Sequence, residues 1–118
     1  MDTLQRFENH KFMNVETYRK SGDVVRTPVW FVIEDGDLYF TTDPNSGKVK
    51  RMRNNPRVNV APCKSNGELL GEWSPATARF PEAERLNEVK RIYIEKYNLE
   101  KDHFEKESNP FFVALKPA

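Results

Sequence analysis

Residues 24–42, VVRTPVWFVIEDGDLYFTT, carry the clearest structural signal in the chain. The first ten residues of this stretch are rich in β-branched and aromatic side chains, and in the second half both faces are apolar. This pattern predicts a strand that is buried on both sides. Asp35-Gly36 is a strong hairpin signal, and residues 38–42 form the expected returning strand. The stretch therefore predicts an antiparallel hairpin.

The rest of the chain extends this pattern. Further strands are expected at residues 12–18, 58–63, 73–80 and 111–115. Short helices are expected around Leu4 and Phe7 and over residues 48–54. The longest helix opens at Pro81 and places one apolar face toward the core, formed by Ala83, Leu86, Val89, Tyr93 and Tyr97. Six strands joined by hairpin turns predict a mainly β (α+β) fold, a six-stranded antiparallel barrel formed by one domain over residues 1–118.

Composition supports a folded domain with a small core. The 118 residues are 37% hydrophobic and 31% charged, and they include eight Phe, four Tyr and two Trp. The aromatic content excludes a disordered chain. A chain of this size buries a modest share of its surface, so dimerisation is expected to complete the core.

Several classes of protein and site are not expected. No apolar run approaches the roughly 20 residues of a membrane span, and the first residues do not resemble a signal peptide, so we expect a cytoplasmic protein. Cys63 is the only cysteine and there are two histidines, so neither a disulfide nor a metal site is expected. Cys63 itself is expected to be a small buried hydrophobe. No arrangement of nucleophile, base or paired carboxylates suggests a catalytic side chain, so a cofactor would carry any chemistry.

Positive charge is concentrated in one segment. Residues 44–67 hold six basic and no acidic side chains, whereas the whole chain has a net charge of +1. Such a segment attracts anions, although a solvated helix face is an open alternative. A nucleic-acid surface is not expected, because the basic residues cluster on a short helix instead of alternating with aromatic residues on a strand.

Within this segment, Ser46-Gly47-Lys48 resembles the end of a P-loop. Val49 stands where a Ser or Thr is required, and Thr42 stands where the first Gly is required, so nucleoside triphosphate hydrolysis is excluded. A polar loop that leads into a short helix still offers free N–H groups and a positive dipole end. With Lys48 and Lys50 nearby, this loop predicts a phosphate site.

Two strands are interrupted by proline. Pro28 marks an edge strand or a bulge, and Trp30 close by is either a flat surface for a ligand or a core residue. Pro75 interrupts the strand at residues 73–80 in the same way. Arg79, among small residues in that strand, could reach an anion or an acidic surface.

Four segments together resemble the split β-barrel flavoproteins related to pyridoxamine 5′-phosphate oxidase, and within them the group that binds the deazaflavin F-420. These segments are RKSG (residues 19–22), RTPVWF (26–31), YFTT (39–42) and SGKVKRMRNNPRV (46–58). The resemblance runs from about residue 10 to the C-terminus. It implies a six-stranded split barrel that forms a homodimer with two elongated cofactor sites at the interface.

The resemblance also implies which residues bind the cofactor. The ring system would rest against Thr27, Pro28, Val29 and Trp30, and the ribityl chain would pass Thr41 and Thr42. The phosphate would be held at the helix start, and two arginines would contribute, one of them from the partner subunit. The residues at the helix start are Ser46, Lys48, Val49 and Lys50, and the arginines are Arg53 and Arg79 of the partner subunit.

The cofactor would be F-420 or FMN, which share a ring, a ribityl chain and a phosphate. F-420 adds an anionic lactyl–oligoglutamate tail that would suit Arg51, Arg53 and Arg57, and this charge favours F-420. The expected function is an oxidoreductase that transfers a hydride to or from a small organic substrate. The alternative is a flavin or deazaflavin carrier or sensor without turnover.

Overall fold

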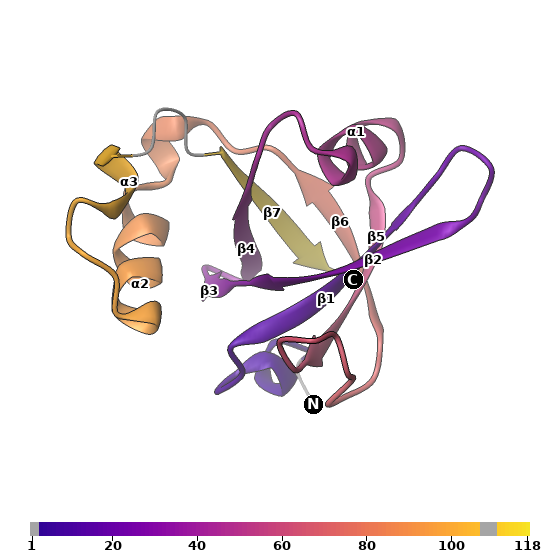
Figure 1. The fold of residues 1–118 in the computed structure, drawn as a ribbon, viewed down its shortest axis with the longest axis horizontal. Helices are drawn as coiled ribbons and strands as arrows, with labels where there is room; N and C mark the ends of the chain where they lie inside the picture. The colour runs from indigo at the N-terminus through magenta and orange to yellow at the C-terminus, as the bar shows by residue number, and fades with distance from the viewer. Residues whose placement is uncertain (1–2, 107–110) are drawn as a thin grey trace.

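The computed structural model describes residues 3–106 and 111–118. In these residues seven antiparallel strands form one sheet with the order β2-β1-β5-β6-β7-β4-β3, and the sheet curls into a half-barrel (Figure 1). The strands are β1 Phe12–Tyr18, β2 Val24–Trp30, β3 Val32–Glu34, β4 Asp37–Thr42, β5 Arg57–Cys63, β6 Ser74–Arg79 and β7 Phe111–Pro117. The predicted split-barrel fold class is confirmed.

The extra strand arises because the predicted strand at residues 24–33 is interrupted. β2 ends at Trp30 and pairs with β1, whereas β3 begins at Val32 and pairs with β4. Burial on both sides is therefore wrong for β2, which is an edge strand: Val24 is 43% exposed and Trp30 is 40% exposed. Only Phe31 and Val32, at the break, are fully enclosed.

The Asp35-Gly36 turn and Pro28 adopt conformations that the sequence predicted. Asp35 and Gly36 have φ angles of 49° and 84°, which is the left-handed conformation that a two-residue hairpin turn requires. Pro28 lies on the edge strand in regular register opposite Asn14, so it marks an edge and not a bulge.

The core has two parts on opposite faces of the sheet. Inside the curl, apolar side chains from five strands meet Phe7 and Met52. On the outer face of β3, β4 and β7, a second cluster packs beneath the helices α2 and α3 (Figure 1). Its members are Val32, Tyr39, Leu86, Val89, Tyr93, Phe104, Phe112 and Ala114. Cys63 is buried at the end of β5, as expected.

The helices are short: η1 Thr3–Phe7, α1 Gly47–Asn54, η2 Ala83–Arg85, α2 Asn87–Tyr97 and α3 His103–Lys106. The helix predicted from Pro81 is broken at Leu86, whose ψ of 0° ends η2 and precedes α2. Ala83 therefore lies outside the packed face and is exposed. α3 is held by the buried Phe104. No helix in the described part of the chain is long and apolar enough to cross a membrane.

Side chains of α2 hold the break between β2 and β3. Tyr93 Oη donates to the Trp30 carbonyl at 2.9 Å, and Tyr97 Oη accepts the Phe31 N–H at 2.8 Å. Lys96 Nζ donates to the Phe31 carbonyl at 2.8 Å and lies 3.7 Å from the centroid of the Phe31 ring. The break leaves backbone groups without a partner in the ladder, and α2 supplies those partners.

Burial at this break shifts the pKa values of two side chains on α2, Lys96 and Tyr97. Burial lowers the pKa of Lys96 from 10.5 to about 8. Burial also raises the pKa of Tyr97 to about 12, against the opposing effect of its bond to Phe31. The Lys96 residue as a whole is exposed. Its pKa is therefore lowered by the burial of the amine against Phe31, and not by burial of the whole side chain.

The lowered pKa of Lys96 predicts a specific pH dependence of stability. Between about pH 8 and 10.5 the unfolded chain binds the proton more tightly than the folded chain does, so Lys96 favours folding more as the pH rises. Urea unfolding at several pH values should show wild type gaining stability relative to Lys96→Met and Lys96→Arg over this range. A stability difference that stays constant from pH 7 to 10 would contradict this placement of the amine.

Candidate functional site

The start of α1 offers a group of unsatisfied donors. Ser46 caps the helix, because its Oγ accepts the Val49 N–H at 3.4 Å and its carbonyl accepts the Lys50 N–H at 3.2 Å. The N–H groups of Gly47 and Lys48 belong to the first turn, where no intrahelical acceptor exists. Thr42 Oγ1 lies 3.5 Å from Ser46 Oγ and adds a second hydroxyl beside them.

Three cations gather at this helix end. Arg51 Nε donates to Thr17 Oγ1 on β1 at 2.7 Å. The Arg51 guanidinium folds back over the helix start, since a Cβ on residue 47 would lie 2.8 Å from its Nη1. Arg19 follows β1 and lies close enough for its charge to repel that of Arg51. Arg51 in turn repels the charge of Lys48.

Among the described residues, no acidic side chain pairs with these cations. Burial, and then repulsion by Arg51, lowers the pKa of Lys48, and burial followed by repulsion from Arg19 lowers the pKa of Arg51. Within the part of the chain that the structure describes, no carboxylate forms an ion pair with Arg19, Lys48 or Arg51. Asp43, in the adjoining loop, accepts the Asn45 N–H with its carboxylate at 2.8 Å. The helix start is therefore a positive site suited to an anion.

The strand expected to receive the ring lies away from this cation group, along the β1–β2 hairpin. Thr17, which holds Arg51, also donates to the Val25 carbonyl at 3.4 Å, whereas Trp30 pairs with Phe12 at the far end of β1. The five residue-to-residue steps from Phe12 to Thr17 span about 16 Å of extended strand. Thr27, Pro28, Val29 and Trp30 therefore lie along the edge strand, and Trp30 is at the end farther from the helix start.

Trp30 is not a core residue. Its ring stacks on Tyr97 with the centroids 4.3 Å apart and the planes 10° from parallel. With 40% of the residue exposed, Trp30 presents a flat apolar surface at the end of the edge strand. This resolves the alternatives left open by the sequence in favour of an accessible aromatic surface.

The structure brings together only some of the residues that were predicted to bind the cofactor. Thr42, Ser46, Lys48 and Val49 lie at the start of α1, where the Val49 side chain is buried and Lys50 is exposed. Thr41, on the neighbouring strand position, donates its hydroxyl to the Phe111 carbonyl at 3.0 Å.

Two predicted arginines are engaged elsewhere in the same chain. The Arg53 guanidinium lies 4.4 Å from the centroid of the Phe80 ring. Arg79 forms an ion pair with Asp37 and a 3.2 Å hydrogen bond to the Tyr39 hydroxyl. The bond to Asp37 is the main reason why the pKa of Arg79 is raised.

Sequence reasoning missed Arg19 as a member of the cation group and assigned Arg51 to a different role. Lys48 and Arg51 are three residues apart on α1, a spacing that places them on the same helix face, so that pair was visible in the sequence. Arg51, Arg53 and Arg57 have different surroundings: Arg51 contacts Thr17, Arg53 covers Phe80, and Arg57 begins β5.

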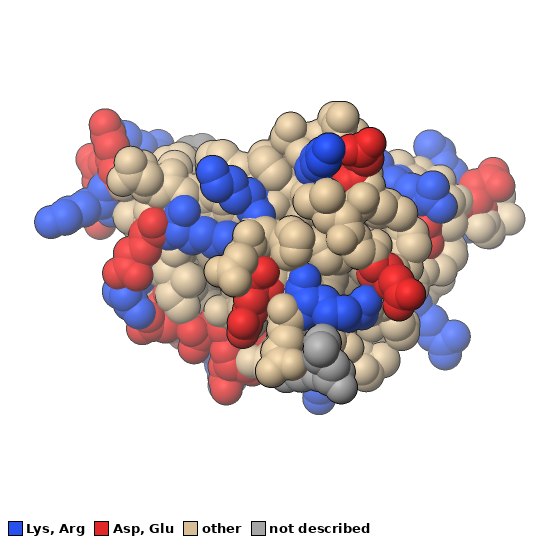
Figure 2. All heavy atoms as spheres, turned by 90° about the horizontal axis from the view of Figure 1, so that it is seen from below, with Lys and Arg blue, Asp and Glu red and all other residues tan. Residues whose placement is uncertain are grey.

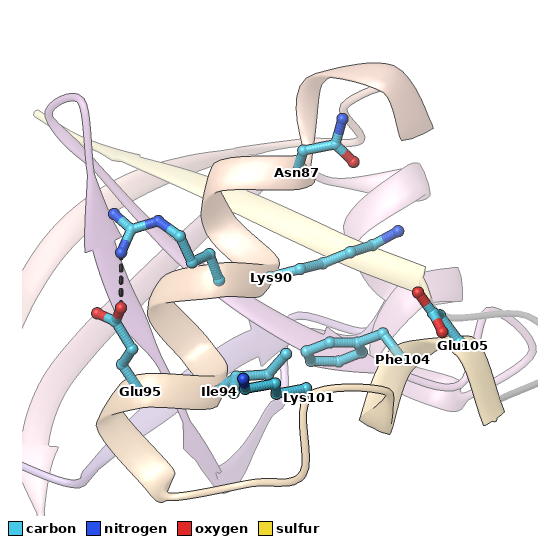
Figure 3. Close-up of a pocket in the computed structure, with 8 residues that line it drawn as sticks. Asn87, Lys90, Ile94, Glu95, Lys101, Phe104 and Glu105 are labelled. Carbon is cyan, nitrogen blue, oxygen red and sulfur yellow. Dashed lines mark hydrogen bonds and ion pairs between the residues drawn. The ribbon is translucent and has the colours of Figure 1, made fainter.

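Other parts of the surface do not add to this site. A cavity of about 450 Å³ between α2 and α3 contains none of the predicted residues (Figure 3). Ile94 and Phe104 meet within it, and Lys90, Lys101 and Glu105 lie around them. The face shown in Figure 2 carries basic and acidic side chains interspersed, without a broad area of one sign. In the described residues no three His, Cys, Asp or Glu side chains group as metal ligands would.

Solved structures share this fold. The heme storage protein HutZ from Vibrio cholerae aligns with a TM-score of 0.77 at 15% identity, over 98% of this chain and 87% of that one. An F420 reductase aligns with a TM-score of 0.67 at 12% identity, over 97% and 91% of the two chains. An FAD-binding protein from Mesorhizobium loti aligns with a TM-score of 0.67 at 16% identity, over 97% and 84%.

The comparison with known families extends over nearly the whole chain. No curated protein matches the sequence. The family model described as pyridoxamine 5′-phosphate oxidase matches residues 1–116, which include β1 to β6, all of β7 except Pro117, and the cation group at α1. Together with the curled antiparallel sheet, this match shows that the chain belongs to the pyridoxamine 5′-phosphate oxidase family.

Proposed function

We propose that this protein is a homodimeric cytoplasmic oxidoreductase that binds F-420 or FMN and transfers a hydride to or from a small organic substrate. The observation that carries the proposal is the group of cations at the start of α1, Arg19, Lys48 and Arg51, which lacks an acidic partner among the described residues. When bound, the cofactor supplies the redox chemistry, and the protein supplies binding and orientation.

The donors at this helix end fit a phosphate group. A phosphate presents several acceptor oxygens and one to two negative charges. The helix start offers the N–H groups of Gly47 and Lys48, the Ser46 and Thr42 hydroxyls, and the nearby cations. An anion there would offset the mutual repulsion of Lys48 and Arg51 and would hold both in their charged forms. These residues would hold the phosphate end, and Trp30 would offer its exposed face to the ring.

The edge of the sheet supports a dimer. β2 is an edge strand, and Val24, Trp30, Leu69 and Leu70 are the large apolar residues that remain exposed in the described part of the chain. An uncovered edge with apolar side chains favours pairing with another surface. A second copy of the chain would cover this area and complete an interface site.

The choice between the two cofactors depends on the arginines outside the cation group. Arg51 is committed to the helix start, so only Arg53 and Arg57 remain for an anionic tail. Both are exposed, and Arg57 has no ion pair in the described residues. Their positive charge supports F-420 over FMN.

The absorption spectrum of the purified protein after reconstitution tests the proposal. F-420, FMN and haem absorb at different wavelengths, so one scan distinguishes them. A bound deazaflavin or flavin that is reduced and then reoxidised by an organic acceptor supports the proposed oxidoreductase. A haem spectrum, or no bound cofactor, would contradict it, and binding without turnover of any reducible substrate would assign a carrier.

The first prediction from this function concerns the phosphate end. Lys48→Ala should weaken binding of both FMN and F-420 by about 1.5–3 kcal/mol, the range for a hydrogen bond to a charged group. The matched control is Lys64→Ala, because Lys64 pairs with Glu68 on a separate turn at 2.6 Å, and it should leave both affinities unchanged. Fluorescence titration measures both, and equal affinities for Lys48→Ala and wild type would exclude the assigned phosphate site.

A second prediction separates the two cofactors. The double variant Arg53→Ala/Arg57→Ala should lose affinity for F-420 and keep its affinity for FMN. Each exposed contact is worth about 0.2–1 kcal/mol, and the loss should shrink at high salt because exposed charges are screened over about 8 Å at physiological ionic strength. If the variant loses equal affinity for both cofactors, these arginines do not recognise the tail.

The third prediction concerns assembly. Sedimentation equilibrium should give twice the chain mass, and a Leu70→Asp variant should shift the protein toward monomer because it places a charge in the exposed apolar area. Exposed Lys101 provides the control, and Lys101→Asp should leave the dimer intact. A stable monomer that binds the cofactor at full affinity would show that the site does not require a partner.

A further inference from the structure

Trp30 owes its orientation to α2 and not to the sheet. It is the last residue of an edge strand, so no neighbouring strand fixes its outer side. One face of its ring is covered by Tyr97 in a nearly parallel stack at 4.3 Å. The backbone on either side of it is held by Tyr93, Lys96 and Tyr97.

We propose that Tyr97 and Lys96 are positioning residues that fix Trp30 so that its open face can receive the cofactor ring. This inference rests on the proposed function, because the ring is placed against β2 only there. It adds a residue set from α2, which lies outside every segment that suggested cofactor binding from the sequence.

The hydroxyl of Tyr97 joins three backbone groups. It accepts the Phe31 N–H at 2.8 Å, and it lies 2.7 Å from both the Phe31 and the Lys11 carbonyls, to one of which it donates. A single hydroxyl therefore connects the start of β1 to the end of β2, while the ring of the same residue supports Trp30. Removing the hydroxyl alone would leave the Phe31 N–H without this partner and would free the residue that follows Trp30.

Lys96 also holds Phe31, through the carbonyl of that residue. Its ammonium donates to the Phe31 carbonyl at 2.8 Å and contacts the Phe31 ring at 3.7 Å. No carboxylate of the described residues forms an ion pair with it. The adjoining cavity of about 400 Å³ is lined by Glu8 and Asn9 beside apolar residues. The contacts of Lys96 are thus directed at the strand break, and a guanidinium at this position could also donate to the Phe31 carbonyl.

Tyr93 has a different role. It is 2% exposed and packs against Phe104 and Phe112 in the outer core, so its loss would open a cavity and destabilise the whole fold. Tyr97 and Lys96 lie at the rim of this core, where conservative changes remove the contacts at the break without removing core volume. They are therefore the residues with which the proposal can be tested.

The experiment uses the full chain with Trp73→Phe, which leaves Trp30 as its only tryptophan. Tyr97→Phe, Lys96→Met, Lys96→Arg and the control Lys101→Met are titrated with FMN and with F-420. Quenching and emission wavelength of Trp30 are recorded together with the dissociation constant. We expect Tyr97→Phe and Lys96→Met to weaken binding about 3- to 10-fold, the effect of one hydrogen bond. The Trp30 emission should also shift before any cofactor is added, and Lys96→Arg and Lys101→Met should match the parent.

The outcomes separate this inference from the proposed function. If the parent protein binds FMN or F-420 but Tyr97→Phe and Lys96→Met bind it equally tightly, the positioning role is wrong and the proposed function stands. A lower melting temperature with unchanged Trp30 emission and unchanged affinity also overturns the inference, because it shows a structural role only. If the parent binds neither cofactor, both proposals fail.

Discussion

The hydrogen bond from Arg51 to Thr17 joins the short helix α1 to the barrel, and the candidate site depends on it. Thr17 is buried in β1, so this bond places a guanidinium at the barrel wall and directly over the helix start. Val49 and Met52 anchor the adjoining face of the helix in the core. The arrangement brings Lys48 and Arg51 together with the free N–H groups of the first turn, at the cost of mutual repulsion. A bound anion removes that cost, which is why the charge pattern and the helix geometry support the same function.

The second constraint is that one continuous segment of the chain forms two strands, and each of them pairs with a different neighbouring strand. Residues 24–34 pair first with β1 and then with β4, so the ladder breaks at Trp30–Phe31. The break costs backbone hydrogen bonds, and α2 replaces them from a position 60 or more residues further along the chain. The same contacts fix an exposed tryptophan on the edge strand. The backbone contacts at the break and the orientation of Trp30 therefore depend on the same three side chains.

Local signals in the sequence predicted the parts of the fold that local chemistry controls. The Asp35-Gly36 turn depends on the φ angles of two adjacent residues, and the short helix expected over residues 48–54 follows directly from the polar loop before it. The split of residues 24–33 was not predictable in this way, because it depends on which strands lie beside each half. The same holds for Arg79, whose partner Asp37 comes from another strand. At the start of α1, the spacing of Lys48 and Arg51 was visible in the sequence, whereas Arg19 comes close only through the tertiary fold. The stacking of Tyr97 on Trp30 likewise depends on the tertiary fold.

The most direct measurement of the central claim is the pKa of Lys48, obtained by NMR of lysine labelled at Cε, with and without FMN. In the free protein burial and Arg51 hold this pKa below 10.5. If the phosphate binds at the start of α1, its negative charge favours the ammonium and the pKa of Lys48 should rise on binding. A cofactor that binds at saturation and leaves the pKa of Lys48 unchanged would contradict this account.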